Sequence, residues 1–136
     1  MDQDNQVHQL ACVRHTFPDT PCRERRGCEN CANAIRLKPG SEERYKRYHA
    51  AVWPEVLSMI HQCNIRNYSI FLREPENLLF AYFEYHGEDL AADMASIAAD
   101  PVMQDWWAVC GPCQERLPTR KKGEWWAPME SVFFHA

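Results

Sequence analysis

The alternation of apolar and polar residues along the chain predicts a mixed domain of helices and strands. Residues 34–38 alternate apolar and charged side chains, as a half-buried strand does. From Ser41, a predicted helix N-cap, the apolar residues recur with a helical period and form one stripe: Tyr45, Tyr48, His49, Val52, Val56, Met59, Ile60 and Cys63. Pro54 interrupts this stripe, because proline removes a backbone hydrogen bond inside a helix. The segment is therefore either one kinked helix, or two helices with a break beside His49.

The next part of the chain predicts a β-hairpin followed by two more helices. Residues 65–72 alternate, residues 78–85 form a denser apolar run, and a Glu-Pro-Glu-Asn turn signal separates the two. A short helix is predicted for residues 89–99. Asp100 and Pro101 then provide the cap and first turn of another helix, which carries Val102, Trp106, Trp107 and Val109. Residues 116–128 are predicted to form a basic loop, and residues 131–134 a terminal strand.

The predicted element order is strand, helix, strand, strand, helix, strand. This order is the ferredoxin-like βαββαβ pattern of an α+β fold. Helices on one face of such a sheet leave the other face open, and the apolar content predicts that a second copy covers it. We assign this domain to residues 31–136. Residues 1–30 contain prolines and a charged cluster without periodicity, and are predicted to be a flexible N-terminal extension.

Composition narrows the classes of function. The formal net charge of −4 over 136 residues argues against nucleic-acid and membrane-surface roles, which favour a basic face. Apolar runs stay well short of the roughly 20 residues that span a bilayer. The acidic, polar N-terminus lacks the basic start and apolar centre of a secretory signal, so we expect a cytoplasmic protein. Its seven cysteines are then expected to be mostly reduced.

One group of aromatic residues surrounds a histidine: Tyr45, His49, Tyr68, Trp106 and Trp107. Tyr45 and His49 are four residues apart and therefore share a helix face. Tyr and Trp combine a flat apolar ring with a hydrogen-bonding tip, which suits a sugar, and histidine transfers protons near neutral pH. The same residues are also what the core of an aromatic-rich domain contains. Spacing alone favours that second interpretation.

Two cysteine motifs offer alternative chemistry. Cys110-Gly-Pro-Cys113 matches the dithiol motif of thioredoxin-like proteins, but it follows a helix near the end of the chain instead of a strand. We therefore expect a solvated connection from helix to loop. Cys28 and Cys31 form a second Cys-x-x-Cys pair, and neighbouring residues are conceivable zinc ligands with it: Cys12, His15 and Cys22. Their spacing matches no established zinc module, so unpaired thiols on the extension are favoured.

Several short motifs together resemble one known family. The helix motif Tyr45-Lys46-Arg47-Tyr48-His49, with Val52-Trp53-Pro54-Glu55, is similar to that of the L-rhamnose mutarotase family. Further similar segments follow in the same order as in that family: Asn67–Leu72, Asn77–Ala81 and the pair Trp106-Trp107. Gly123-Glu124-Trp125-Trp126 and the segment Met129–Phe134 resemble the C-terminal end of its eukaryotic-type members. The resemblance runs from about residue 31 to residue 136.

The resemblance implies a homodimeric α/β barrel of ferredoxin-like subunits. It implies an isomerase that interconverts the α and β anomers of L-rhamnose by acid/base ring opening and closure, without a metal or an organic cofactor. His49 matches the family's proton donor, and the sugar-binding positions match Tyr45, Tyr68, Trp106 and Trp107. A non-catalytic sugar-binding or interaction protein on the same fold stays open as an alternative, as does a metal-dependent cysteine-rich regulator. The residues do not distinguish L-rhamnose from L-fucose or another 6-deoxy sugar.

Overall fold

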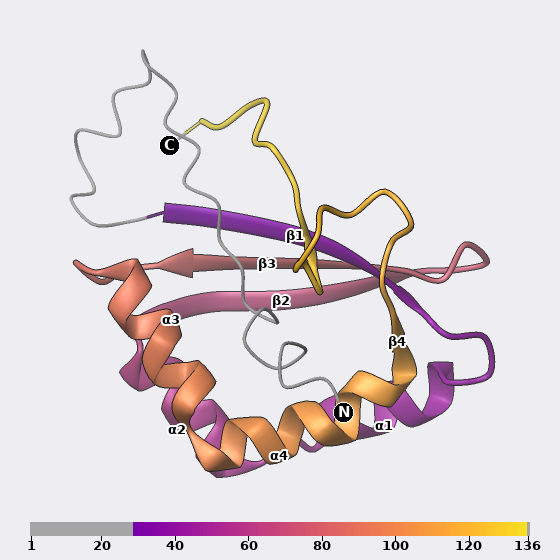
Figure 1. Cartoon of the computed structure of the whole chain (residues 1–136), viewed down its shortest axis with the longest axis horizontal. Helices are drawn as coiled ribbons and strands as arrows, with labels where there is room; N and C mark the ends of the chain where they lie inside the picture. The colour runs from indigo at the N-terminus through magenta and orange to yellow at the C-terminus, as the bar shows by residue number, and fades with distance from the viewer. Residues whose placement is uncertain (1–28, 136) are drawn as a thin grey trace.

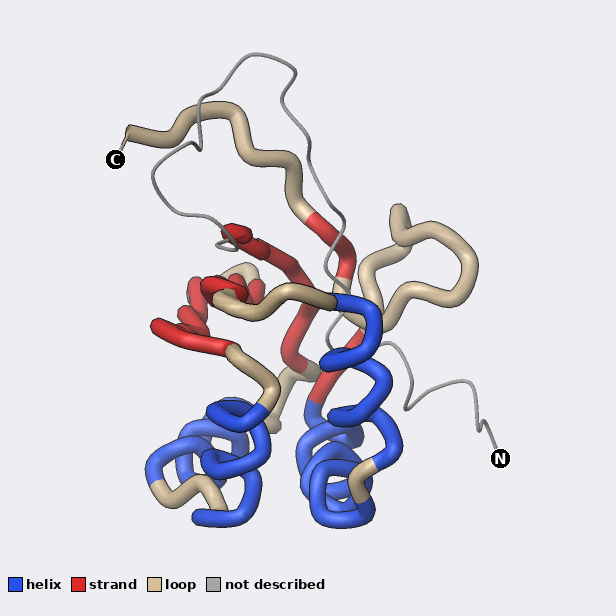
Figure 2. Tube along the Cα trace, turned by 90° about the vertical axis from the view of Figure 1, so that its left-hand side faces the viewer, coloured by secondary structure: helices blue, strands red, loops and turns tan. Residues whose placement is uncertain are grey.

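The computed structural model describes residues 29–135 as one antiparallel sheet with helices on one of its faces (Figures 1 and 2). Its strands are β1 (Glu29–Leu37), β2 (Ile65–Arg73), β3 (Leu78–Tyr85), β4 (Gln114–Glu115) and β5 (Ala127–Pro128). The strand order is β2-β3-β1-β4, and β5 also pairs with β1. β1 therefore lies inside the sheet, with β3 along one edge and both short C-terminal strands along the other.

The helices are α1 (Glu42–Ala50), α2 (Pro54–Gln62), α3 (Leu90–Ala99), α4 (Pro101–Cys110) and the 3₁₀ turn η2 (Gly111–Cys113). The break at Pro54 separates two helices, because proline fits the first turn of α2. Asp100 caps α4, and its Oδ2 accepts a hydrogen bond from the backbone N–H of Met103 at 3.1 Å. Ser41 is the N-cap of α1, but its side chain makes no capping hydrogen bond.

The core lies between the sheet and the helices. The apolar stripe predicted for residues 45–63 is buried or half-buried along its whole length. It packs against strand residues such as Ile35 and Phe83, which are both fully buried. None of the helices described in residues 29–135 has the length and hydrophobicity of a membrane span.

The predicted terminal strand at residues 131–134 is wrong. Pairing along this edge of β1 occurs instead at β4 and β5, and β5 occupies the end of the segment predicted as a loop. Pro128 has no N–H to continue a ladder, and the last contact is the Met129 N–H donating to the Ala32 carbonyl at 2.8 Å. Beyond it Val132 and Phe133 are 87% and 83% exposed. An apolar run alone predicts a strand, but this segment pairs with none of the strands in the described part of the chain.

Asn33 is a polar residue in the middle of β1. Its side chain is 3% exposed, and its Oδ1 is the one buried side-chain atom without a hydrogen-bond partner in residues 29–135. Leaving such an acceptor unpaired costs about 1–3 kcal/mol. Asn33→Val should therefore raise the free energy of unfolding by about 1 kcal/mol, because valine also suits a strand. Urea unfolding followed by circular dichroism measures this change, and a lower midpoint would contradict it.

Candidate functional site

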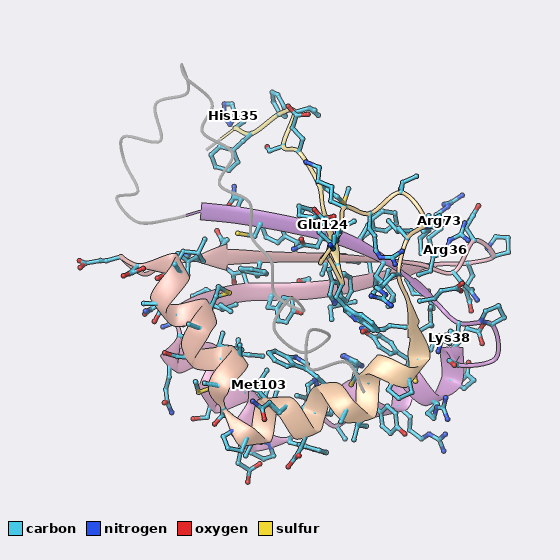
Figure 3. All side chains as sticks on the ribbon, viewed as in Figure 1. Arg36, Lys38, Arg73, Met103, Glu124 and His135 are labelled. Carbon is cyan, nitrogen blue, oxygen red and sulfur yellow. The ribbon has the colours of Figure 1, made fainter. Side chains whose placement is uncertain are left out.

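A small pocket lies between α1, α4 and the sheet. Its cavity has a volume of about 40 Å³. The five aromatic and histidine residues singled out from the sequence all line it, from α1, β2 and α4: Tyr45, His49, Tyr68, Trp106 and Trp107. The remaining lining residues are Ile60, Ile70, Met103, Cys110, Gln114 and Trp126. Met103 belongs to α4 below the sheet in the view of Figure 3, so the wall of the pocket is built from both layers.

The backbone of α1 fixes the protonation pattern of His49. The rings of Tyr45 and His49 are stacked with centroids 4.2 Å apart. His49 Nδ1 lies 2.9 Å from the backbone carbonyl of Tyr45. A carbonyl only accepts, so Nδ1 carries the proton and Nε2 is the nitrogen left for other partners. Burial lowers the pKa of His49. The hydrogen bond to the Tyr45 carbonyl raises it, but by less, so the net shift is downward. The ring is therefore neutral near pH 7, with Nε2 as an acceptor.

Edge-to-face contacts between aromatic rings stabilise the other walls of the pocket. The Trp106 ring meets His49 edge-on at 5.4 Å between centroids and Trp53 at 5.2 Å. Tyr68 packs edge-on against Phe83 at 5.6 Å. Burial is the main cause that raises the pKa values of the Tyr45 and Tyr68 hydroxyls, so both stay protonated. The pocket thus combines flat apolar surfaces, two hydroxyl groups and one neutral imidazole.

Two polar or aromatic contributors to this pocket, Gln114 and Trp126, were not singled out from the sequence. Gln114 is 3% exposed, accepts a hydrogen bond from Trp125 Nε1 at 2.7 Å and donates one to Tyr45 Oη at 3.2 Å. Trp125 and Trp126 are also buried. The signal available in the sequence is this tryptophan pair, which stands in a segment predicted to be a basic loop.

The Cys-x-x-Cys motif at the end of α4 is not the solvated connection that the sequence predicts. Cys110 and Cys113 are buried, at 3% and 0% exposure, and both are free thiols. Burial is the main cause that raises the pKa of Cys110 to about 12. Redox chemistry needs a thiolate at an accessible position, and this thiol has neither property. Cys110 instead forms part of the pocket wall.

The other cysteine motif is described only at its second member. Cys31 is disulfide-bonded, contrary to the reduced state expected for it. The remaining conceivable zinc ligands, which are Cys12, His15, Cys22 and Cys28, lie outside the described residues. Over residues 29–135, no group of three or more His, Cys, Asp or Glu side chains is placed to hold a metal ion.

The fold and the pocket together show which class of protein this is. It is a small α+β protein in which an antiparallel sheet and its covering helices enclose an aromatic pocket around one histidine. A family model described as L-rhamnose mutarotase matches residues 30–135, and the chain belongs to this family. The family-level resemblance of the sequence motifs is thereby confirmed.

Individual relatives agree with this assignment. An L-rhamnose mutarotase of Mesorhizobium japonicum is 34% identical over 111 residues, which is 79% of this chain and 98% of the relative. One of Sinorhizobium fredii is 38% identical over 77% of this chain and 96% of its own length. The crystal structure of an L-rhamnose mutarotase from Formosa agariphila matches at a TM-score of 0.61 and 25% identity, covering 79% of this chain and 99% of that one. A polyketide cyclase of Streptomyces glaucescens, tetracenomycin F2 cyclase, shares the fold alone, at a TM-score of 0.57 and 12% identity.

The lowered pKa of His49 predicts how folding stability depends on pH. An exposed histidine titrates near 6.5, and folded His49 titrates below that value. As the pH falls through this window the unfolded chain binds a proton that the folded chain does not, so folding stability decreases. In an NMR titration the His49 ring signals should have a midpoint below 6.5, and His49→Gln should weaken the loss of stability at acid pH. A midpoint at or above 6.5 would show that burial does not control this ring.

Proposed function

We propose that this chain is an isomerase that interconverts the α and β anomers of L-rhamnose by acid/base ring opening and closure. The observation that carries the proposal is the pocket itself, which joins His49 to two tyrosines and two tryptophans in a chain of the L-rhamnose mutarotase family. The named relatives are mutarotases of this sugar. The pocket residues provide the groups that such a reaction needs, and the role of each is part of the proposal.

Sugar binding uses the aromatic walls. Trp106 and Trp107 offer flat surfaces to the C–H face of the pyranose, and the Tyr45 and Tyr68 hydroxyls hydrogen-bond to its oxygens. The pocket walls are side chains, whose rotamers commonly change when a ligand binds.

His49 carries the proton. In its neutral form, Nε2 takes the proton of the anomeric hydroxyl, and the electron pair of that O–H bond goes on to form the carbonyl at C1. The bond between C1 and the ring oxygen breaks, and the ring oxygen receives the proton that Nε2 now donates. The product is the open aldehyde with a hydroxyl at C5. Rotation of the aldehyde and the same steps in reverse close the ring as the other anomer.

His49→Ala tests this role. A positioned acid/base group contributes about a hundredfold to ten-thousandfold, so the variant should lose most of the acceleration of anomer exchange. Saturation transfer between the two anomeric ¹H signals of L-rhamnose measures the exchange rate. His61→Ala is the matched control, because His61 lies exposed on α2 away from the pocket lining.

Each result of that experiment separates the alternatives. Wild-type exchange that disappears only in His49→Ala supports both the reaction and the residue. Exchange at the wild-type rate in His49→Ala would exclude His49 as the proton carrier. Binding of L-rhamnose without faster exchange in the wild type would instead favour a non-catalytic sugar-binding protein. A panel of 6-deoxy sugars, including L-fucose, then identifies the preferred substrate.

We also infer that the subunit is ferredoxin-like and that two copies form a homodimer through their sheets. The order of elements and the strand order β2-β3-β1-β4 support the first point. Phe71 supports the second, because it points to the side of β2 opposite Ile70, which lines the pocket, and is 61% exposed. Phe71 is paired with Phe80, and Phe80 with Ala34, so an apolar row crosses this outer face. Arg36 and Arg73 lie at one end of the sheet (Figure 3).

Phe71→Glu tests the dimer. A carboxylate at the β2 end of the apolar row should prevent two copies from burying this row, and the variant should be monomeric while keeping its fold. Sedimentation velocity measures the mass of each form, and circular dichroism checks the fold. Leu57→Glu is the matched control, because Leu57 is 53% exposed on α2 at the other side of the molecule. A monomeric wild type, or a dimer that survives Phe71→Glu, would contradict the sheet-to-sheet arrangement.

Three further points stay predictions. We propose that the domain spans residues 31–136 with an N-terminal extension of residues 1–30. The buried Trp125 and Trp126 support placing the chain among eukaryotic-type members of the family, whose C-terminal motif these residues resemble. A cytoplasmic location is expected from composition alone.

A further inference from the structure

Gln114 connects the C-terminal part of the chain to the pocket through a buried amide. It is the first residue of β4, directly after the turn that contains Cys113. Its two side-chain hydrogen bonds join residues distant in sequence, to Trp125 on one side and Tyr45 of α1 on the other. Both bonds are buried, so neither is weakened by competition with bulk water.

The Trp125 contact determines which way the amide faces. An indole N–H only donates, so the atom 2.7 Å from Trp125 Nε1 must be the amide oxygen. The NH₂ group therefore faces Tyr45, where it donates to Oη at 3.2 Å. Tyr45 Oη is the acceptor in that bond. Its own hydroxyl proton consequently has to point to a different acceptor.

We infer that Gln114 is a positioning residue, which turns the Tyr45 hydroxyl into a hydrogen-bond donor toward the sugar. The inference rests on the proposed function. It adds that Tyr45 donates, and does not accept, in its hydrogen bond with the sugar. Tyr45 lines the pocket and its carbonyl already accepts from His49 Nδ1. One residue of α1 thus fixes the histidine as acceptor through its backbone, while its own side chain is fixed as donor by Gln114 and Trp125. The pocket then presents one hydrogen-bond donor, the Tyr45 hydroxyl, and one acceptor, His49 Nε2. Both roles are fixed before a ligand binds.

The loop between β4 and β5 acts on the pocket through the same amide. Arg116 lies over the Trp125 ring, with its Cζ 5.2 Å from the ring centroid, and Trp126 lines the cavity. Trp125 therefore contacts both the Gln114 amide, through its Nε1, and Arg116 of the loop, through its ring. The role of Gln114 is positioning, since the proposed contact to the sugar is made by Tyr45.

Gln114→Glu reverses the polarity with almost no change in shape. One carboxylate oxygen still accepts from Trp125, and the other now accepts from Tyr45, so the Tyr45 proton turns away from the pocket. The dissociation constant of L-rhamnose should rise about tenfold, the effect of losing one hydrogen bond, and Tyr45→Phe should cause a loss of similar size. In the Tyr45→Phe background Gln114→Glu should add little further loss, because the hydroxyl it misdirects is absent. Titration of L-rhamnose by calorimetry measures binding without relying on turnover.

The pH profile separates positioning from a general structural role. Protonation of the carboxylate introduced by Gln114→Glu restores a donor toward Tyr45, so the affinity of this variant relative to the wild type should recover as the pH falls. A variant damaged in its packing would not recover. Gln62→Glu is the matched control for the added charge, because Gln62 is exposed on α2. If Gln114→Glu does not fold, Gln114→Met removes the same donor without a charge, and its loss should again vanish in the Tyr45→Phe background.

The outcomes are distinguishable from failure of the proposed function. Wild-type protein that neither binds nor exchanges L-rhamnose would overturn the function and this inference together. Normal wild-type binding with unchanged affinity in Gln114→Glu, or with losses that add fully to that of Tyr45→Phe, would overturn only the role of Gln114. Non-additive losses together with recovery at low pH would support it.

Discussion

Hydrogen bonding along both edges of β1 is the constraint from which the site follows. On one edge β3 pairs with β1 over its length, and on the other edge β4 and β5 pair with two separate parts of it. The chain leaves this edge after Glu115, opposite Arg36, and returns at Ala127, opposite Ala34. Eleven residues, 116–126, must therefore close a loop over a very short stretch of one strand. That closure brings Trp125 back to Gln114 and places Trp126 in the pocket wall.

Pairing along β1 also determines where α1 lies relative to β4. α1 begins five residues after β1 ends, so the helix that carries Tyr45 and His49 starts close to the end of the strand that holds β4. Gln114 can reach Tyr45 only because β4 pairs with the last residues of β1. The donor and the acceptor of the pocket thus depend on backbone pairing outside it. If the pocket is the sugar site proposed above, its polar directions are determined before any ligand arrives, which reduces the entropic cost of ordering the site.

The sequence predicted most of the elements, and its failures have physical causes. Helical periodicity and the Asp100 cap are local signals that placed α4 within a residue or two. Pro54 marked the break before α2, but the sequence left a single kinked helix open as the alternative. The five residues proposed for the site are close in space because helix spacing and strand alternation determine their faces. The strand expected at residues 131–134 failed because a strand requires a partner, which no local pattern specifies. Gln114 was missed for the same reason, since its significance comes from contacts to residues 69 and 11 positions away.

Burial has opposite consequences for the different titratable groups of the pocket, and these consequences define its chemistry. Taking a group out of water disfavours its charged form, so the same environment lowers the pKa of His49 and raises those of Tyr45 and Cys110. A thiol held in this state is unsuited to redox exchange, whereas a neutral imidazole with one free nitrogen is suited to accept a proton. Mutarotation needs no net charge on the protein before or after the reaction, because the proton that leaves one sugar oxygen returns to another. A pocket that keeps all its groups neutral is therefore matched to a reaction that only moves a proton within the substrate.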